Sequence, residues 1–360
     1  MNRRHCLRAV ASLAATYAFS VHANLAKADP LVSSPAELDV GDWEHWKQAF
    51  LAEDGRVIDH LQENASHSEG QGYGMLLATW FGDEQTFLKM HQWTSQFLAV
   101  RRDPLLAWRW SPQQHPQISD YNNATDGDLF YAWALLRAGR RFGAPDYLTK
   151  AQEIARFIAR SCIHADPRGG GRLLLLPGAE RFAAGGEVTV NPSYYMPLAM
   201  RELGLATLTP DLLRCADDGE VLLEELAAVG PIPNWVDVGP SGWRYSRTHG
   251  AQSGYDALRA ALFLIWSGRS DHGAVRRAAQ LYATAEGNEK PVPVVIEPSG
   301  QNVLTTSDLP GYVAVAALVR CADGASQHSA IPKFVDEQPY FPATLHLFSH
   351  IAAKTVGLTC

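Results

Sequence analysis

The segment LFYAWALL, residues 129–136, is apolar nearly all the way round a helix, and it indicates the fold class of this protein. A helix without a polar face has to be buried on every side. Other helical segments, such as 146–160, keep one polar face, as helices at a surface do. Fully buried helices that alternate with amphipathic ones predict two concentric layers of helices.

Helical patterns dominate the rest of the chain, and strand patterns are few and short. The predicted helices span 74–81, 85–100, 129–141, 148–162, 212–229, 255–266, 274–285 and 345–356. The predicted strands span 172–176, 188–190 and 293–296.

Helix-start signals, which are small or polar capping residues, repeat along the chain. They occur near Asp42, Ser66, Thr125, Asn191, Ser253 and Ser307. After the second start the spacing is roughly sixty residues, about the length of two helices with their loops. We therefore predict six helical hairpins closed into a ring, which is an all-α (α/α)6 barrel with a few short strands.

The composition fits one large domain and a neutral partner. Hydrophobic residues make up 46% of the 360 positions and charged residues 19%, which leaves enough apolar material for a core. No low-complexity linker divides the chain, so residues 29–360 are predicted to form a single domain. The formal net charge is -7, and no run of lysine or arginine follows the first residues. This charge pattern argues against nucleic acid as a partner.

The N-terminus has the pattern of a secretory signal peptide. Arginines near the start are followed by an apolar stretch over 9–19 and by two A-x-A-type sites that end at Ala23 and Ala28. The apolar stretch is too short to span a membrane, and no later segment reads as a membrane span. We predict a signal peptide over residues 1–28, a mature protein without a membrane span, and a periplasmic or secreted location.

Cysteine usage does not decide the disulfide pairing. Beyond Cys6, which lies in the predicted signal peptide, the chain has Cys162, Cys215, Cys321 and Cys360. Four cysteines allow three full pairings, and a chain of this size needs none of them. They form no CxxC motif and do not resemble a zinc site.

Four carboxylates stand at predicted helix starts, and each allows two interpretations. They are Glu69, Asp126, Asp128 and Asp256. Because Glu69, Asp128 and Asp256 each follow a Ser or Thr by three residues, each taken singly is best explained as part of a capping box. Taken together, they favour catalysis, because the inner helices of such a ring run in the same direction and their N-termini meet at one mouth.

Aromatic residues cluster beside these acids. They are Tyr73, Trp80, Trp108, Trp110, Tyr121, Tyr194, Tyr195, Trp243, Tyr245 and Tyr255. Glycosidic cleavage needs one acid that protonates the leaving oxygen and a second that activates water or attacks the sugar, and aromatic rings stack on pyranose faces. We therefore predict a carbohydrate-cleaving site, with Trp108 and Trp110 as candidates for stacking.

Four motifs resemble glycoside hydrolase family 8, and especially the endoglucanases encoded beside bacterial cellulose synthases. They are SEGQGYGM at 68–75, ATDGD at 124–128, NPSYY at 191–195 and YDALR at 255–259, and they occur in the family's order. The resemblance implies an (α/α)6 barrel, inversion at the anomeric carbon, and a catalytic domain over 29–360.

The resemblance also implies roles for single residues. Glu69 is expected to be the general acid and Asp256 the general base. Asp126 is expected to hold the distorted sugar in the central subsite, with Asp128 as the weaker candidate. Tyr194 and Arg259 are expected in the cleft near that sugar, and Tyr73 is a further candidate for substrate binding.

The substrate and the biological role stay open at this point. Cellulose or a related β-1,4-glucan is favoured, with the cellulose synthase complex as a partner suggested by the resemblance alone. A chitosanase or xylanase of the same family, a polysaccharide lyase and a non-catalytic glycan-binding protein are the alternatives. The sequence contains no HExxH, P-loop, G-x-S-x-G or dinucleotide-binding motif, so no cofactor or metal is implied.

Overall fold

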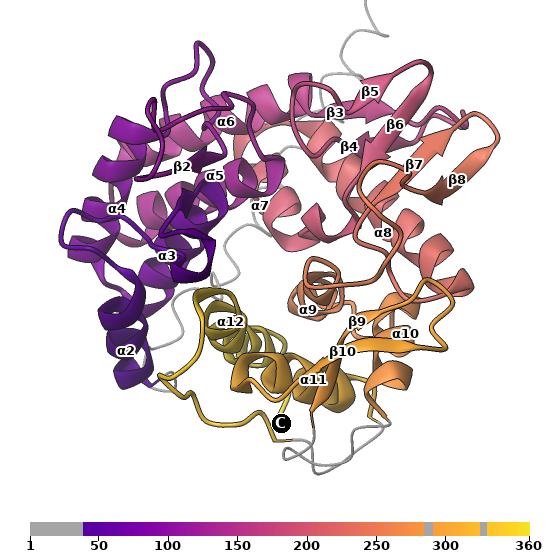
Figure 1. Cartoon of the computed structure of the whole chain (residues 1–360). Coiled ribbons are helices and arrows are strands. Elements are labelled where there is room, and N and C mark those ends of the chain that lie inside the picture. The colour runs from indigo at the N-terminus through magenta and orange to yellow at the C-terminus, as the bar shows by residue number, and fades with distance from the viewer. Residues whose placement is uncertain (1–38, 284–290, 325–329) are drawn as a thin grey trace, which may run out of the picture. The chain divides into compact units, whose positions relative to one another are not determined.

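The computed structural model describes residues 39–283, 291–324 and 330–360. Over these residues, about half of the chain is helical and the strands are short. The helices form a ring, in which the chain runs from α2 and α3 through α5 to α8 and on to α11 and α12 (Figure 1). This is the predicted (α/α)6 fold. The predicted signal peptide lies outside the described residues.

Six helices form the inner layer, and all but the third of them begin at the same end of the ring, which we call the mouth. They are α3 (Ser68–Phe81), α5 (Thr125–Arg141), α7 (Pro197–Thr207), α9 (Leu258–Trp266), α11 (Pro310–Ala322) and α12 (Tyr340–Val356). In α5 the residues from Thr125 to Gly139 are all buried, and α9 is buried over its whole length. The apolar segment 129–136 therefore lies where its pattern predicts.

The outer layer consists of amphipathic helices that bury one face each. They are α2 (Val40–Phe50), α4 (Glu84–Phe97), α6 (Pro145–Ser161), α8 (Pro210–Val229) and α10 (Gly273–Tyr282). In α6, for example, only Ala151, Ile154, Ala155 and Ile158 are buried, which is the spacing of one helix face.

Aromatic side chains from the inner helices fill the centre of the ring. Tyr73 packs edge-on against Phe130 and Phe348, with ring centroids 4.6 Å and 5.0 Å apart. Trp266 lies 5.1 Å from Phe348 and 5.5 Å from Trp133. The barrel is therefore a packed core, so the site has to lie at its mouth.

Helices α11 and α12 lie side by side and run in the same direction. At the mouth, a Cβ atom on Gly311 would come within 1.8 Å of the carbonyl oxygen of Pro342, so only glycine allows this approach. At the other end, a disulfide joins Cys321 to Cys360. This disulfide answers the open question of pairing, and Cys162 and Cys215 are free and buried.

The short strands of the described residues form small antiparallel sheets. Strands β5 (Ala183–Ala184), β6 (Glu187–Val190), β7 (Val236–Gly239) and β8 (Gly242–Tyr245) form an antiparallel sheet in that order. Three antiparallel pairs complete the set: β1 (Ser66–His67) with β2 (Arg109–Trp110), β3 (Ile163–Ala165) with β4 (Leu173–Leu175), and β9 (Val292–Ile296) with β10 (Val303–Ser307).

The observed elements differ from the predicted ones at several points. Helix α3 begins at Ser68 rather than at residue 74, because its glycines, which weaken helix propensity, are used for close packing. Helices α2, α7 and α11 were indicated only by start signals. Helix α12 follows α11 with no helix over residues 330–339, so the described ring is not made of six equal hairpins.

Candidate active site

One arginine joins the predicted catalytic residues at the mouth. The Nη1 atom of Arg259 donates to Glu69, to Tyr73 (3.1 Å) and to Asp126 (3.2 Å). Its Nη2 atom lies 3.4 Å from Oδ1 of Asp256. Arg259 is 1% exposed. A single buried cation thus contacts three carboxylates that come from different inner helices or from the loop before α9.

Close packing of α3 and α5 brings Glu69 and Asp126 to this arginine. A Cβ atom on Gly127 would lie 2.1 Å from Oγ of Ser68 and 2.7 Å from the backbone nitrogen of Glu69. A Cβ atom on Gly72 would lie 2.9 Å from the backbone nitrogen of Tyr131. Glycine at these two positions therefore lets the two helix starts touch, which explains why both motifs contain it.

None of the predicted capping boxes forms. The N-caps of α3 and α5 are His67 and Ala124, and neither side chain caps its helix. Ser66 instead donates to the carbonyl of Val57 at 2.6 Å. The side chains of Glu69 and Asp256 contact Arg259 instead, and that of Asp128 accepts hydrogen bonds from Leu106 and Asn123. The capping interpretation therefore does not apply to these three acids.

Glu69 combines a buried surrounding with an opening to solvent. Its side chain is 21% exposed. Burial raises the pKa of Glu69 to about 8; Arg259 opposes this shift, and the charges of Asp126 and Asp256 add to it. The helix N-terminus favours an ionised carboxylate, but burial and like charge are the larger effects here. Glu69 is therefore protonated near neutral pH, as a general acid must be.

Asp126 lies deeper than Glu69, at 2% exposure. Its Oδ1 accepts a hydrogen bond of 2.8 Å from the backbone amide of Gly127, and its Oδ2 faces Arg259. Burial raises the pKa of Asp126, while Arg259 and the Gly127 amide act in the opposite direction. Asp126 is thus held in a buried place, where it contacts the same nitrogen of Arg259 as Glu69 does.

Asp256 lies on a loop rather than in a helix. The helix predicted over 255–266 begins at Leu258, because Oδ1 of Asn234 accepts hydrogen bonds from the backbone amides of Gly254 (2.8 Å) and Ala257 (3.2 Å). These bonds hold the loop in a turn. The Asp256 side chain is 38% exposed, the most open of the three carboxylates.

The NPSYY motif contacts Arg259 at the site. Asn191 caps the short 3-10 helix η3 (Pro192–Tyr194). Ser193 accepts a hydrogen bond of 2.8 Å from Nη2 of Arg259, and the guanidinium lies 5.6 Å from the centre of the Tyr194 ring. Tyr194 is therefore at the site, as predicted from the motif. Asn191 and Ser193 are site residues that the sequence analysis did not single out.

An open cavity of about 500 Å³ includes both proposed catalytic groups. Glu69, Asp256 and Tyr255 line it together with Tyr312 of α11 and Tyr340 of α12. Tyr255 is 45% exposed and packs against Tyr312, with ring centroids 5.7 Å apart. Tyr312 and Tyr340 were not singled out from the sequence, because no motif surrounds them.

The remaining predicted binding residues occupy different places. Trp108 lies beside the start of α3, since its carbonyl accepts a hydrogen bond from the Ser68 amide and its ring stacks on His67 at 6.0 Å. Trp110 packs instead against Trp93 and Phe97 of α4.

Two further candidates lie below the surface of the site. Tyr73 is fully buried, and its hydroxyl accepts a hydrogen bond from Nη1 of Arg259. Asp128 is also fully buried, and its carboxylate accepts hydrogen bonds from the Leu106 amide (2.7 Å) and from Asn123 (2.9 Å). Burial raises the pKa of Asp128 to about 8. Asp128 therefore anchors the segment that leads to Trp108.

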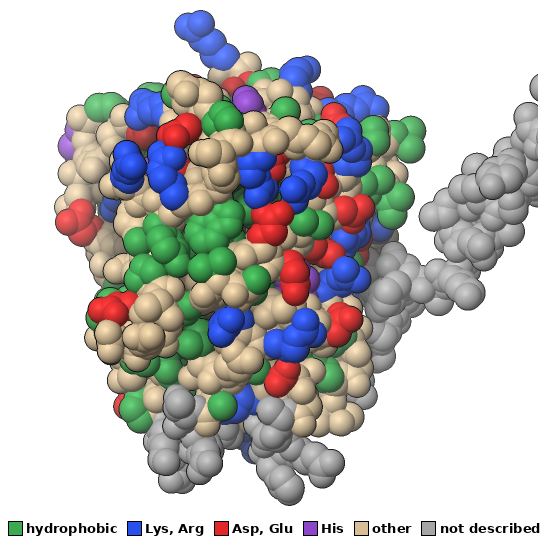
Figure 2. Space-filling model, turned by 90° about the vertical axis from the view of Figure 1, so that its right-hand side faces the viewer, with side chains coloured by type: hydrophobic (Ala, Val, Ile, Leu, Met, Phe, Trp, Pro, Cys, Tyr) green, Lys and Arg blue, Asp and Glu red, His purple; other side chains and the backbone are tan. Residues whose placement is uncertain are grey.

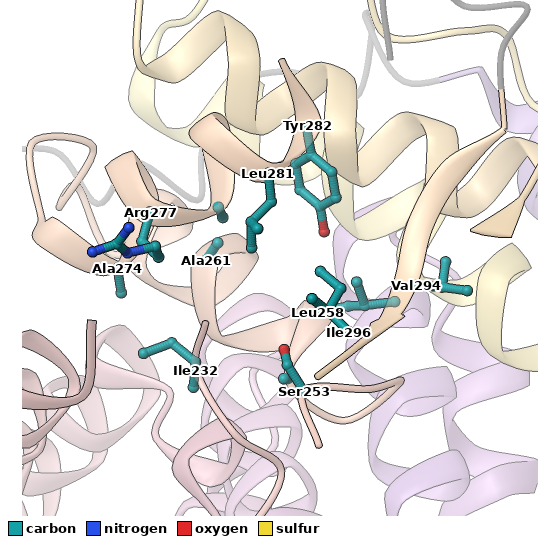
Figure 3. A pocket seen from close by; sticks show the side chains of 12 residues that line it. Ile232, Ser253, Leu258, Ala261, Ala274, Arg277, Leu281, Tyr282, Val294 and Ile296 are labelled. Carbon is teal, nitrogen blue, oxygen red and sulfur yellow. The ribbon is translucent and has the colours of Figure 1, made fainter. Parts of the chain in front are cut away.

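A second cavity, between α9, α10 and β9, has different chemistry. Its volume is about 30 Å³, close to that of a single water molecule. Figure 3 shows mainly aliphatic side chains around it, with Leu258 and Ile296 facing Leu281 and Tyr282. This cavity is too small for a sugar and contains no carboxylate.

The residues that the structure describes contain neither a cluster of metal-binding side chains nor a membrane-spanning helix. No group of three or more His, Cys, Asp or Glu side chains there has the arrangement of a metal site. None of the described helices combines the length and hydrophobicity needed to cross a bilayer.

The helical barrel and the carboxylates at its mouth define a class of protein, the barrel hydrolases that cleave glycosidic bonds with a pair of acids. The family described as Glycosyl hydrolases family 8 matches residues 6–355, and this chain belongs to it. The protein is thus a glycoside hydrolase.

The chain is similar to several proteins that are described as endoglucanases. A probable endoglucanase of Novacetimonas hansenii is 32% identical over 331 residues, which cover 90% of this chain and 92% of that protein. The structure of the endo-β-1,4-glucanase CMCax from Acetobacter xylinum is 28% identical with a TM-score of 0.79, and the match covers 90% of this chain and 100% of that one. The endoglucanase Cel10 of Klebsiella pneumoniae is 29% identical with a TM-score of 0.79, over 88% and 99% of the two chains.

Proposed function

We propose that the protein is an endo-β-1,4-glucanase that hydrolyses cellulose or a related β-glucan with inversion at the anomeric carbon. The observation that carries the proposal is that Glu69 and Asp256 line one open cavity and are joined through Arg259. The endoglucanase relatives support the class of substrate.

Glu69 is the general acid in this proposal. Its raised pKa keeps a proton on the carboxyl near neutral pH, and its exposed edge faces the cavity. The proton passes to the glycosidic oxygen as the bond to the anomeric carbon breaks. Arg259 then stabilises the carboxylate that remains, whereas the negative charges of Asp126 and Asp256 act against it.

Asp256 is the general base. Its two oxygens accept hydrogen bonds from Asn191 and Arg259, so the group is held as an acceptor. Its exposed side leaves room for a water molecule, from which it takes a proton as the water attacks the anomeric carbon. An inverting mechanism requires the two carboxyl groups to be roughly 6.5–9.5 Å apart.

Asp126, Tyr194 and Arg259 form the central subsite. Asp126 and Arg259 are nearly fully buried and held by several hydrogen bonds, so they provide a rigid polar floor against which a distorted sugar ring is held. The ring of Tyr194 closes one side. Trp108, next to Ser68, provides a stacking surface near the acid.

The charge pattern of the chain suits a neutral glucan better than a polyanion, because no run of lysine or arginine follows the first residues. On the side of the molecule shown in Figure 2, positive and negative side chains are likewise interspersed. Chitosan and xylan remain the alternative substrates within the family, and membership of the family argues against a lyase.

The test is hydrolysis of carboxymethylcellulose, chitosan and xylan by the purified protein, with the Glu69→Gln variant beside it. A fast fall in carboxymethylcellulose viscosity that depends on Glu69 supports an endoglucanase, and cleavage of only chitosan or xylan would replace the substrate. Proton NMR of the first products then shows whether the new reducing end is the α-anomer, as inversion requires.

We further propose that residues 1–28 are removed on export and that the enzyme works in the periplasm or outside the cell, assisting a cellulose synthase complex. The charged and apolar pattern of the N-terminus supports export. The disulfide between Cys321 and Cys360 suits an oxidising compartment. N-terminal sequencing of the protein recovered from the periplasm or medium tests the cleavage after Ala28, and co-purification with the synthase tests the partner.

A further inference from the structure

We infer that Asn191 is a positioning residue for Asp256, and that it acts through a closed ring of hydrogen bonds with Ser193 and Arg259. The inference rests on the proposed function, in which Asp256 is the general base. It gives a role to the first and third residues of the NPSYY motif.

The ring can be followed from atom to atom. Nδ2 of Asn191 donates to Oδ2 of Asp256 at 3.2 Å. Oδ1 of Asn191 accepts from the backbone amide and the hydroxyl of Ser193, at 3.0 Å and 2.8 Å. The Ser193 hydroxyl in turn accepts from Nη2 of Arg259 at 2.8 Å, and the same Nη2 lies 3.4 Å from Oδ1 of Asp256.

The donors and acceptors in this ring allow only one orientation of the Asn191 amide. An asparagine amide has one oxygen that accepts and one nitrogen that donates. Because two Ser193 groups donate to the oxygen, the nitrogen has to face Asp256. Asn191 is 1% exposed and Ser193 is fully buried, so water does not compete for these bonds.

The consequence is that both oxygens of Asp256 receive one protein donor each. The plane of the carboxylate is thereby set, and the lone pairs that remain point toward the open side of the cavity, where the water has to lie. Asn191 is nearly fully buried and does not line the cavity, so it acts through Asp256.

The variant Asn191→Asp tests this role with the smallest change. It keeps an oxygen that accepts from Ser193, and so keeps the cap of η3, but it replaces the donor to Asp256 by a second carboxylate oxygen. We expect kcat to fall by about ten- to hundredfold, which is the loss of one hydrogen bond to a charged group. We expect KM to change by less than about threefold, because the substrate contacts remain.

The pH profile provides the readout that a structural role would not move. Asp256 in the variant lacks a donor and has a like charge beside it, so the acidic limb of kcat/KM is expected to move to higher pH. Ser193→Ala is a second variant, should Asn191→Asp not fold. It breaks the same ring at another atom and is expected to move the same limb in the same direction by a smaller amount.

A matched control exists on an exposed turn. Asn302 donates through Nδ2 to Oε2 of Glu297 at 2.7 Å, so Asn302→Asp makes the same chemical change away from the site. Its kinetics are expected to equal those of the wild type.

The results distinguish a failure of the proposed function from a failure of the role of Asn191. No hydrolysis of any glucan by the wild type overturns the proposed function. Activity retained in Asp256→Asn overturns the role of the base. If Asp256→Asn is inactive while folded Asn191→Asp keeps the wild-type kcat and pH profile, only the role of Asn191 is wrong.

Discussion

Asp126 and Arg259 are joined by a hydrogen bond of 3.2 Å, although 133 positions separate them in the chain. The same guanidinium nitrogen contacts Glu69, and the other terminal nitrogen contacts Asp256. One positive charge is therefore shared by three carboxylates in a buried place. Burial, together with the like charges of Asp126 and Asp256, raises the pKa of Glu69 more than Arg259 lowers it, so Glu69 retains its proton near neutral pH.

Replacing the acid should stop the chemistry while leaving the fold intact. Glu69→Gln removes the proton donor but keeps a similar shape, and we expect kcat on carboxymethylcellulose to fall by about 10²–10⁴-fold. A cello-oligosaccharide with an aryl leaving group of low pKa should be affected much less, because that group needs no proton. Equal losses on both substrates would contradict the role of acid.

The basic limb of the pH profile should report the same proton. The pKa of Glu69 is raised to about 8, so the active, protonated form is present below that pH and is lost as the pH rises through it. We therefore expect kcat/KM to decline above about pH 8. A decline already complete near pH 5, where an ordinary carboxyl group titrates, would show that burial does not hold the proton on Glu69.

Removing the shared cation should be costly for folding as well as for activity. Arg259→Met leaves Glu69, Asp126 and Asp256 without their partner, and we expect a loss of about 3–5 kcal/mol in the free energy of unfolding at neutral pH. Protonation of the acids should relieve part of this loss at low pH. Urea denaturation of wild type and variant at pH 5 and pH 8 measures both effects, and a loss that does not depend on pH would argue against charge as the cause.

Asp128 should make stability fall as pH rises. Its folded pKa is raised to about 8 from an ordinary value of 3.8, so the folded state binds a proton that the unfolded state has released between these values. The folded state therefore loses stability over this window, with a limiting slope of about 1.4 kcal/mol per pH unit for one group. Asp128→Asn cannot titrate, so its unfolding free energy should depend less on pH there; an unchanged slope would refute the assignment.

The disulfide should matter for stability and not for catalysis. Cys321 and Cys360 are 39 residues apart in sequence, and closing a loop of that size stabilises a protein by about 3–4 kcal/mol. We expect Cys321→Ser to lower the unfolding free energy by this amount while kcat at low temperature stays unchanged, because the bond lies at the end of the barrel opposite the mouth. Reductant should destabilise the wild type but leave the variant unaffected.

Trp108 and Trp110 should separate binding from packing, although they are two residues apart. Trp108→Ala should raise KM, since the Trp108 carbonyl bonds to the Ser68 amide next to Glu69 and its ring stacks on His67. Trp110→Ala should mainly lower stability, by about 2–3 kcal/mol, because its ring packs on Trp93 and Phe97. Oligosaccharide kinetics and thermal unfolding of both variants check this pair, and the reverse pattern would place Trp110 in the cleft.

Much of the fold could be predicted from the chain because it depends on local patterns. The all-round apolar segment 129–136 required a buried helix, and the start signals near Asn191 and Ser307 preceded the inner helices α7 and α11, for which no range was predicted. The signal near Asp42 marked the outer helix α2 instead, and the inner helix α12 had no such signal. The glycine-rich start of α3 misled the prediction, since Gly72 weakens the helix locally and is explained only by its close contact with α5.

The sequence by itself determined the layers of helices and the acids that are available for catalysis, because periodicity and side-chain chemistry are properties of short segments. Only the tertiary structure decided how those acids are used. Whether Glu69 caps a helix or holds a proton depends on burial and on Arg259, which is 190 positions away. The anchoring role of Asp128, the packing of Trp110 and the ring through Asn191 likewise depend on partners that folding brings together, and no local pattern contains them.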